Sequence, residues 1–143
     1  GVCGLDECVR LITGVSMDES EESLLIGMEI LSSIKREFEQ LNVDITICPE
    51  EFPYEITTDR LARIDSQNYN ELQKFVESKE MQIKYSHSFF LRKGTGLEFG
   101  NVIEKNKKLW SSFSDAPFVF NFPGRGLSKD TILSILKTIA KGE

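Results

Sequence analysis

The spacing of apolar residues along the chain predicts a series of helices. Apolar positions three and four residues apart are typical of a helix that buries one face. This spacing predicts helices over residues 5–13, 19–41, 56–65, 69–78, 97–113 and 128–139. We expect Gly14 to end the first helix and Ser16 or Asp18 to cap the second. Ser128 is expected to cap the last, and Gly100 to interrupt the fifth.

Alternating apolar and polar residues predict three strands between these helices. Val43, Ile45 and Ile47 alternate with polar residues, which is the period of a half-buried strand. A second strand is expected over residues 82–91, with apolar side chains on both faces, and a third between the prolines of segment 117–123. Strands separated by helices favour parallel pairing with crossover helices. The predicted fold class is therefore α/β, with a small, mostly parallel sheet of about three strands.

Length and composition narrow the class of protein further. At 143 residues, the chain fits a single α/β domain over residues 1–143. No run approaches the roughly 20 apolar residues of a membrane span, so we expect a cytoplasmic protein with no membrane partner. A net charge of −6 argues against a nucleic-acid partner, because binding to the phosphate backbone needs a basic surface.

The two ends of the chain suggest a piece of a longer protein. Gly1 is not an initiator methionine, and the sequence stops at Glu143 without a capping segment. A sheet of three strands is also small for this amount of helix, which favours a missing half. A complete small protein with a trimmed tag is an equally open interpretation.

The passage from the first strand into the following helix is a candidate anion site. Backbone N–H groups in the first turn of a helix can bind an anion, and Thr57 and Thr58 would be its natural ligands. Most such junctions bind only water. Glu50, Glu51 and Glu55 crowd the loop before the helix, where they could serve chemistry or simply oppose the helix dipole.

Histidine and cysteine offer few further candidates for chemistry. His87 could be a base or a hydrogen-bonded residue of the strand, and the latter is favoured. A single histidine without a second ligand argues against a histidine metal cluster. Cys3, Cys8 and Cys48 form no Cys-x-x-Cys pair, so we expect free thiols that act as small buried apolar residues. A thiol enzyme that uses Cys48 is the less favoured alternative.

Several short motifs occur in an order that resembles one known family. Residues 1–7 contain Gly-x-x-Gly-x-x-Glu at the start of a short helix, and residues 53–65 contain Pro-x-Glu followed by a helix with Arg and Asp. Residues 85–90 resemble a Tyr-Thr-Asn-Ser-x-His strand, and residues 123–126 occupy the place of an Asn-Gly-Gly turn. Together these motifs resemble the catalytic subunit of the anaerobic, class III, ribonucleotide reductase, a glycyl radical enzyme.

The resemblance implies a fold and a binding site. In that family the region forms part of the second half of a ten-stranded α/β barrel, and the Pro-x-Glu loop with the following helix start holds the substrate's phosphates. By resemblance, the phosphate ligands would be Glu55, Ile56, Thr57 and Thr58. The residues lining the pocket nearby would be Tyr85, His87 and Ser88.

The resemblance also implies what the chain does not supply. It contains no Arg-x-x-Gly-Tyr radical motif, no paired Cys-x-x-Cys zinc site and no finger-loop cysteine segment. His87, Phe90 and Arg125 depart from the family's motifs. We therefore expect no catalytic residue, metal or cofactor in this chain, and no ribonucleotide reduction by the chain alone.

Two functional hypotheses follow. The first is a part or relative of the reductase that contributes a nucleotide phosphate-binding loop to deoxyribonucleotide synthesis for DNA replication, with a nucleotide and the remainder of the reductase barrel as partners. The alternative is a free-standing, non-catalytic binding domain that reuses the fold. In that case the edge over residues 118–122 would pair with a partner or a second copy.

Overall fold

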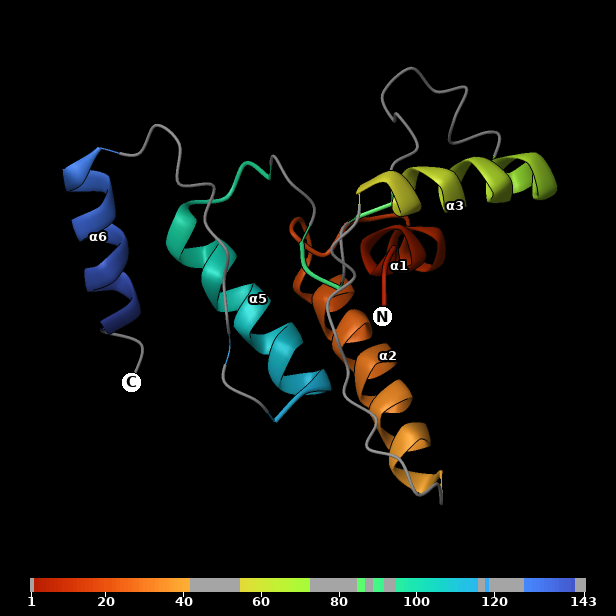
Figure 1. The fold of residues 1–143 in the computed structure, drawn as a ribbon, viewed down its shortest axis with the longest axis horizontal. Coiled ribbons are helices and arrows are strands. Elements are labelled where there is room, and N and C mark those ends of the chain that lie inside the picture. Colours follow the sequence, from red (N-terminus) through yellow and green to blue (C-terminus); the bar gives the residue numbers. More distant parts are fainter. Residues whose placement is uncertain are drawn as a thin grey trace.

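The computed structural model is mostly helical in the part of the chain that it describes. The described residues are 2–41, 55–72, 85–86, 89–91, 95–115, 118 and 128–140. Their helices are α1 (Leu5–Thr13), α2 (Glu21–Gln40), α3 (Glu55–Asn68), α5 (Phe99–Phe113) and α6 (Lys129–Ala140). Figure 1 shows α3 and α6 at opposite ends of the long axis, with α1, α2 and α5 between them.

The first helix is the one that the sequence predicts residue for residue. Gly4 precedes α1 with a φ of 74°, and Gly14 follows it with a φ of 80°, both in the left-handed region that favours glycine. The Gly14 N–H donates to the Arg10 carbonyl at 2.8 Å and so closes the last turn. The predicted role of Gly14 as the end of this helix is therefore confirmed.

The predicted cap of the second helix and the predicted break in the fifth are wrong. The side chain of Ser20 caps α2 by accepting a hydrogen bond from the Ser23 N–H at 3.3 Å. Ser16 instead donates its hydroxyl to Glu19 at 2.7 Å in the preceding turn. Helix α5 runs through Gly100 without interruption.

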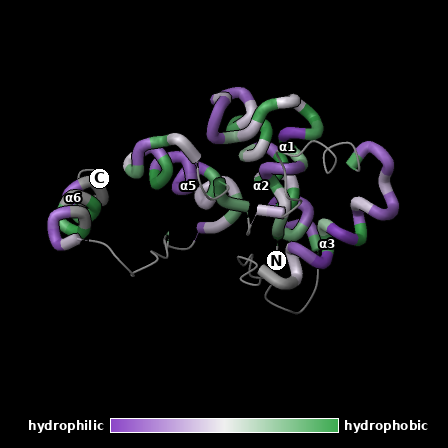
Figure 2. The backbone as a smooth tube through the Cα atoms, turned by 90° about the horizontal axis from the view of Figure 1, so that it is seen from above, coloured by the Kyte–Doolittle hydropathy of each residue, from purple (hydrophilic) through white to green (hydrophobic). Residues whose placement is uncertain are grey.

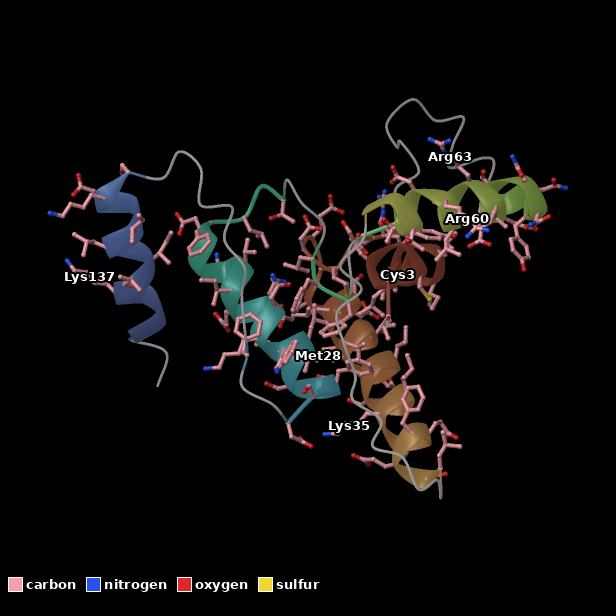
Figure 3. All side chains as sticks on the ribbon, in the orientation of Figure 1. Cys3, Met28, Lys35, Arg60, Arg63 and Lys137 are labelled. Carbon is pink, nitrogen blue, oxygen red and sulfur yellow. The ribbon has the colours of Figure 1, made fainter. Side chains whose placement is uncertain are left out.

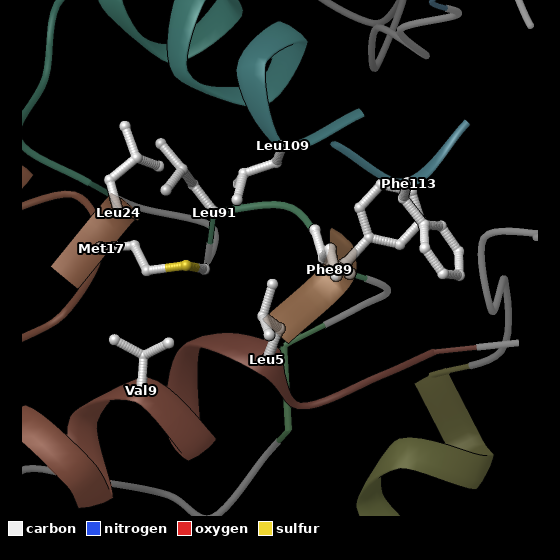
Figure 4. Packing of buried hydrophobic residues seen from close by; sticks show 9 residues of the cluster. Leu5, Val9, Met17, Leu24, Phe89, Leu91, Leu109 and Phe113 are labelled. Carbon is white, nitrogen blue, oxygen red and sulfur yellow. The ribbon is translucent and has the colours of Figure 1, made fainter. Parts of the chain in front are cut away.

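The core lies where α2 packs against α1 and α5. Its central feature is Gly27, because a Cβ there would collide with the sulfur of Met17 and lie 3.6 Å from Leu109. The absence of a side chain lets the helices approach closely. The buried apolar cluster around this contact consists of Leu5, Val9, Met17, Leu24, Leu31, Phe89, Leu91, Leu109 and Phe113 (Figure 4).

The predicted α/β fold is contradicted. The described residues contain no strand beyond an isolated bridge at Val2, and so no parallel sheet with crossover helices and no part of a ten-stranded barrel. The predicted strand over residues 82–91 is described at 85–86 and 89–91, where the chain is irregular and turns at Phe89. The predicted strand at 43–47 lies outside the described residues.

Side chains from helices explain why the segment around residue 90 needs no partner strand. The Leu91 N–H donates to Oδ1 of Asn106 on α5 at 2.9 Å, and the Ser86 N–H donates to Oε1 of Glu7 on α1 at 2.8 Å. These are the donors that a sheet would have paired with a neighbouring strand. Phe89 and Leu91 are buried. From the sequence, such apolar residues were interpreted as a strand covered on both faces, but here they fill a core made by helices.

An aromatic group extends the core at the surface of α5. Phe90 stacks on Trp110 with centroids 6.2 Å apart, and Phe118 meets both rings edge-on at 6.1 Å. Of the edge predicted over residues 118–122, only Phe118 is described. Its ring is half-buried in this aromatic group and lies in no strand.

Charged residues join the helices at the surface. Glu21 at the start of α2 accepts from Lys105 at 3.2 Å and from Lys108 at 3.3 Å on α5. Such exposed pairs add little stability because water screens them.

The hydropathy of the helices bears on whether any of them could lie in a membrane. Figure 2 shows α3 coloured mostly hydrophilic. Among the described helices, none is both long and apolar enough to cross a membrane.

Candidate functional site

The four predicted phosphate ligands occupy the first turn of one helix. Helix α3 begins at Glu55, so Ile56, Thr57 and Thr58 complete its first turn. The first four N–H groups of a helix have no partner within it. Thr58 is only 1% exposed, whereas Thr57 is half-buried. Of the two hydroxyl groups, that of Thr57 is therefore the one that a ligand in solution can reach.

Of the predicted pocket residues, only Tyr85 is described, and its hydroxyl contacts α3 away from this first turn. The Tyr85 hydroxyl donates to Oδ2 of Asp65 at 2.6 Å, in the second half of α3. With a helix rise of about 1.5 Å per residue, Asp65 lies roughly 15 Å from Glu55. His87 and Ser88 lie outside the described residues.

Tyr85 instead belongs to a cluster that we call the Tyr85 junction, made of Gly4, Glu7, Asp65, Tyr85 and Ser86. The two carboxylate oxygens of Glu7 accept from the backbone N–H and the hydroxyl of Ser86, both at 2.8 Å. The Ser86 carbonyl accepts from the Gly4 N–H at 3.2 Å. The start of α1 thus holds the polar groups of Ser86 and fixes the backbone beside Tyr85.

Glycine is required at position 4 of this junction for two reasons. Its φ of 74° is a conformation that other residues rarely adopt. A Cβ there would also lie 3.3 Å from Cγ of the Tyr85 ring. The tyrosine ring therefore packs directly on the backbone that begins α1.

The electrostatics of the junction raise the pKa values of Tyr85, Glu7 and the neighbouring Cys3. Burial, the hydrogen bond to Asp65 and the nearby negative charges raise the pKa of Tyr85, so its hydroxyl keeps its proton. Burial also raises the pKa of Glu7, against the lowering effect of the hydrogen bonds from Ser86. Burial and the charge of Glu7 raise the pKa of the neighbouring Cys3 thiol.

The cysteines differ in their surroundings. Cys3, labelled in Figure 3, is half-buried, and its raised pKa favours the unreactive thiol form. This environment suits the predicted small apolar role. Cys8 is exposed, so the prediction that it is buried is wrong. Cys48 lies outside the described residues.

Of the five residues of the junction, only Tyr85 was predicted as a site residue; its two carboxylates, Glu7 and Asp65, were missed although both belong to the motifs named above. Glu7 closes the motif over residues 1–7, and Asp65 closes the one over residues 53–65. The sequence did contain a signal that could have identified them: each of these motifs ends in a carboxylate, which can accept a hydrogen bond from a residue of another motif. Within the described ranges, no three His, Cys, Asp or Glu side chains gather closely enough to hold a metal ion.

Three motifs that are far apart in the sequence therefore meet at one hydrogen-bonded junction of a helical protein. A family model described as anaerobic ribonucleoside-triphosphate reductase matches residues 1–137. The chain belongs to this family, and the resemblance inferred from the motifs is confirmed. Comparisons with curated proteins and with solved structures gave no match.

The raised pKa of Glu7 predicts a pH-dependent stability. Because the folded-state pKa exceeds the unfolded value of about 4.3, the contribution of Glu7 to stability is fully present below that value and lost as pH rises through the folded pKa. Glu7→Gln should remove this loss, since its amide can still accept from the Ser86 N–H and donate to the Ser86 hydroxyl. Urea denaturation at a series of pH values measures the difference.

The control for this experiment is Glu22→Gln, which alters an exposed glutamate in the first turn of α2. We expect Glu7→Gln to be less stable relative to wild type at low pH than at neutral pH. A constant difference between the two proteins across the series would contradict the prediction.

Proposed function

We propose that this chain contributes a nucleotide phosphate-binding helix start to ribonucleotide reduction in a reductase of its family. The observation that carries the proposal is the start of α3 at Glu55, the glutamate of the Pro-x-Glu motif, in a chain that belongs to this family. Glu55, Ile56, Thr57 and Thr58 thus form the first turn of a helix, where N–H groups have no acceptor within the helix itself.

The chemistry of this turn suits a phosphate group. The partial positive charge at a helix N-terminus favours an anion, to which backbone N–H groups of the first turn can donate. The half-buried Thr57 can add its hydroxyl, while the buried Thr58 would contribute only its backbone. The proposed ligand is the phosphate chain of a nucleoside triphosphate.

We propose further that the chain does not reduce a ribonucleotide by itself. The reaction needs a radical and a source of electrons, and we assign neither to the described residues. The remainder of the reductase would be the partner that supplies them. A cytoplasmic location and a role in deoxyribonucleotide synthesis for DNA replication remain predictions.

Amide NMR spectroscopy tests the proposed binding. Addition of a nucleoside triphosphate, or of inorganic tripolyphosphate, should shift the backbone amide signals of Thr57 and Thr58 until they saturate. Thr57→Val, which removes the hydroxyl and keeps the shape, should weaken binding about 3- to 10-fold, equivalent to one hydrogen bond. Unchanged signals in this turn at millimolar triphosphate would refute the proposal.

The control variant for the titration is Ser66→Ala on the same helix. The Ser66 hydroxyl donates to the Arg63 carbonyl at 2.8 Å, far along α3 from its first turn. This change should leave triphosphate affinity unaltered. A loss of affinity equal to that of Thr57→Val would mean that Thr57 acts through the stability of the helix and not through a contact with phosphate.

A non-catalytic binding role is the second candidate. It is favoured by large apolar side chains that are exposed on two helices, with Ile12 of α1 63% exposed and Leu136 of α6 55% exposed. Sedimentation of the chain over a range of concentrations would test self-association. Monomeric behaviour throughout would remove a second copy as the partner.

A further inference from the structure

Helix α3 is joined to the rest of the described structure differently from the other helices. Helix α2 packs against α1 and α5, and α5 packs against α6, but α3 packs against none of these helices. Figure 1 shows it at the end of the molecule opposite α6. Thr58 and Ala62 on α3 are buried, so α3 contacts other parts of the chain, but packing against α1, α2, α5 or α6 does not set its orientation.

A continuous series of contacts connects α3 to that core through the Tyr85 junction. Glu7 on α1 holds Ser86 by two hydrogen bonds of 2.8 Å. The preceding residue, Tyr85, packs its ring on Gly4, and its hydroxyl donates to Asp65 of α3 at 2.6 Å. The ring is thus fixed at its base by α1, and its tip contacts α3.

We propose that Tyr85 is a positioning residue whose hydrogen bond to Asp65 sets the orientation of α3 relative to the core of α1, α2 and α5. The consequence for nucleotide binding rests on the proposed function, because α3 carries the proposed phosphate ligands. The orienting contact itself does not depend on that function.

The geometry gives the contact a large effect on the proposed ligands. Asp65 lies roughly 15 Å from Glu55 along the helix, so a 10° rotation of α3 about Asp65 moves its first turn by about 3 Å. Binding groups need to be held within about 0.5 Å of their working positions. A loss of orientation at Tyr85 would therefore spoil a site at the opposite end of α3.

The chemistry of the contact between Tyr85 and Asp65 favours a hydrogen bond that stays formed. A distance of 2.6 Å is typical of a hydroxyl that donates to a carboxylate. Burial and the neighbouring negative charges raise the pKa of Tyr85, so the donor keeps its proton under physiological conditions. Tyr85→Phe would remove the donor and leave the ring on Gly4 in place.

Hydrogen exchange measured on Tyr85→Phe tests the orienting contact directly. We expect amide exchange in α3 to become about tenfold faster, corresponding to one lost hydrogen bond, while exchange in α2 stays unchanged. Tyr69→Phe is the matched control, since Tyr69 follows the same helix and is 56% exposed. Equal exchange in α3 of Tyr85→Phe and wild type would overturn the inference, and so would equal acceleration in α2 and α3.

Nucleoside triphosphate titrations of four variants extend the test to binding. Tyr85→Phe and Asp65→Ala should each weaken binding about 3- to 10-fold, and the double variant should be no weaker than either alone. Asp65→Asn keeps an acceptor oxygen and should bind nearly as wild type does. Additive losses in the double variant would overturn the inference.

The two proposals can fail separately. If wild-type protein binds no triphosphate, the proposed function fails, and hydrogen exchange in α3 still decides whether Tyr85 orients the helix. If wild type binds and Tyr85→Phe binds equally well, the proposed function stands and the positioning role of Tyr85 is wrong.

Discussion

Phe89→Ala is expected to lower the free energy of unfolding by about 3–5 kcal/mol, the usual cost of removing a buried phenylalanine. Phe89 is 1% exposed and lies in the cluster between α2 and α5. Its ring contacts Phe113 edge-on with centroids 5.0 Å apart and Phe90 at 4.9 Å. Truncation would leave a cavity that these neighbouring rings cannot fill without losing their own contacts.

Urea denaturation monitored by circular dichroism measures this loss. Phe38→Ala is the matched control, because Phe38 lies on α2 with 41% of its surface exposed and should cost much less. Equal losses for the two variants would mean that Phe89 does not anchor the core. Since Phe89 lies in an irregular segment, the result also tests whether this segment, and not only the helices, carries the fold.

Asn106→Leu is expected to lower the free energy of unfolding by about 1–3 kcal/mol, because it leaves a buried donor without a partner. Asn106 is 2% exposed on α5, and its Oδ1 accepts from the Leu91 N–H at 2.9 Å. Leucine has a similar size but no acceptor. The amide of Leu91 should also exchange faster with solvent, which hydrogen exchange detects together with the denaturation midpoint.

Asn101→Leu provides the comparison on the same helix, where the asparagine is exposed. It should change stability by no more than about 0.5 kcal/mol. Should Asn106→Leu prove equally harmless, the Leu91 N–H would have to find another acceptor. The explanation given above for the irregular backbone at this point would then fail.

The local features of the fold could be predicted because they depend on neighbouring residues. Apolar spacing and the glycine at position 14 defined α1 to the residue, and α6 starts directly after Ser128 as expected. The family was also recognisable, because its motifs are short local patterns in a fixed order. Periodicity and capping act within a few residues, so sequence alone reveals them.

The sequence could not distinguish a strand from irregular core segments at residues 85–86 and 89–91. Both bury apolar side chains, and they differ only in which groups accept the backbone hydrogen bonds. Here the acceptors are the side chains of Glu7, 79 residues before Ser86, and of Asn106, 15 residues after Leu91. No local pattern encodes such pairs, and the predicted sheet was wrong for this reason.

The candidate site, like the fold, has features that could be predicted from the sequence and features that only the structure shows. The sequence by itself predicted a helix from residue 56 with Glu55 in the loop before it, and α3 begins one residue earlier, at Glu55; the prediction came this close because the motif and the apolar spacing are local. Only the tertiary structure decided that Tyr85 pairs with Asp65, 20 residues earlier, and that Gly4 and Glu7 support this contact from α1. The physical reason is that a hydrogen bond needs two groups at about 3 Å, and only the folded chain brings residues so far apart to that distance.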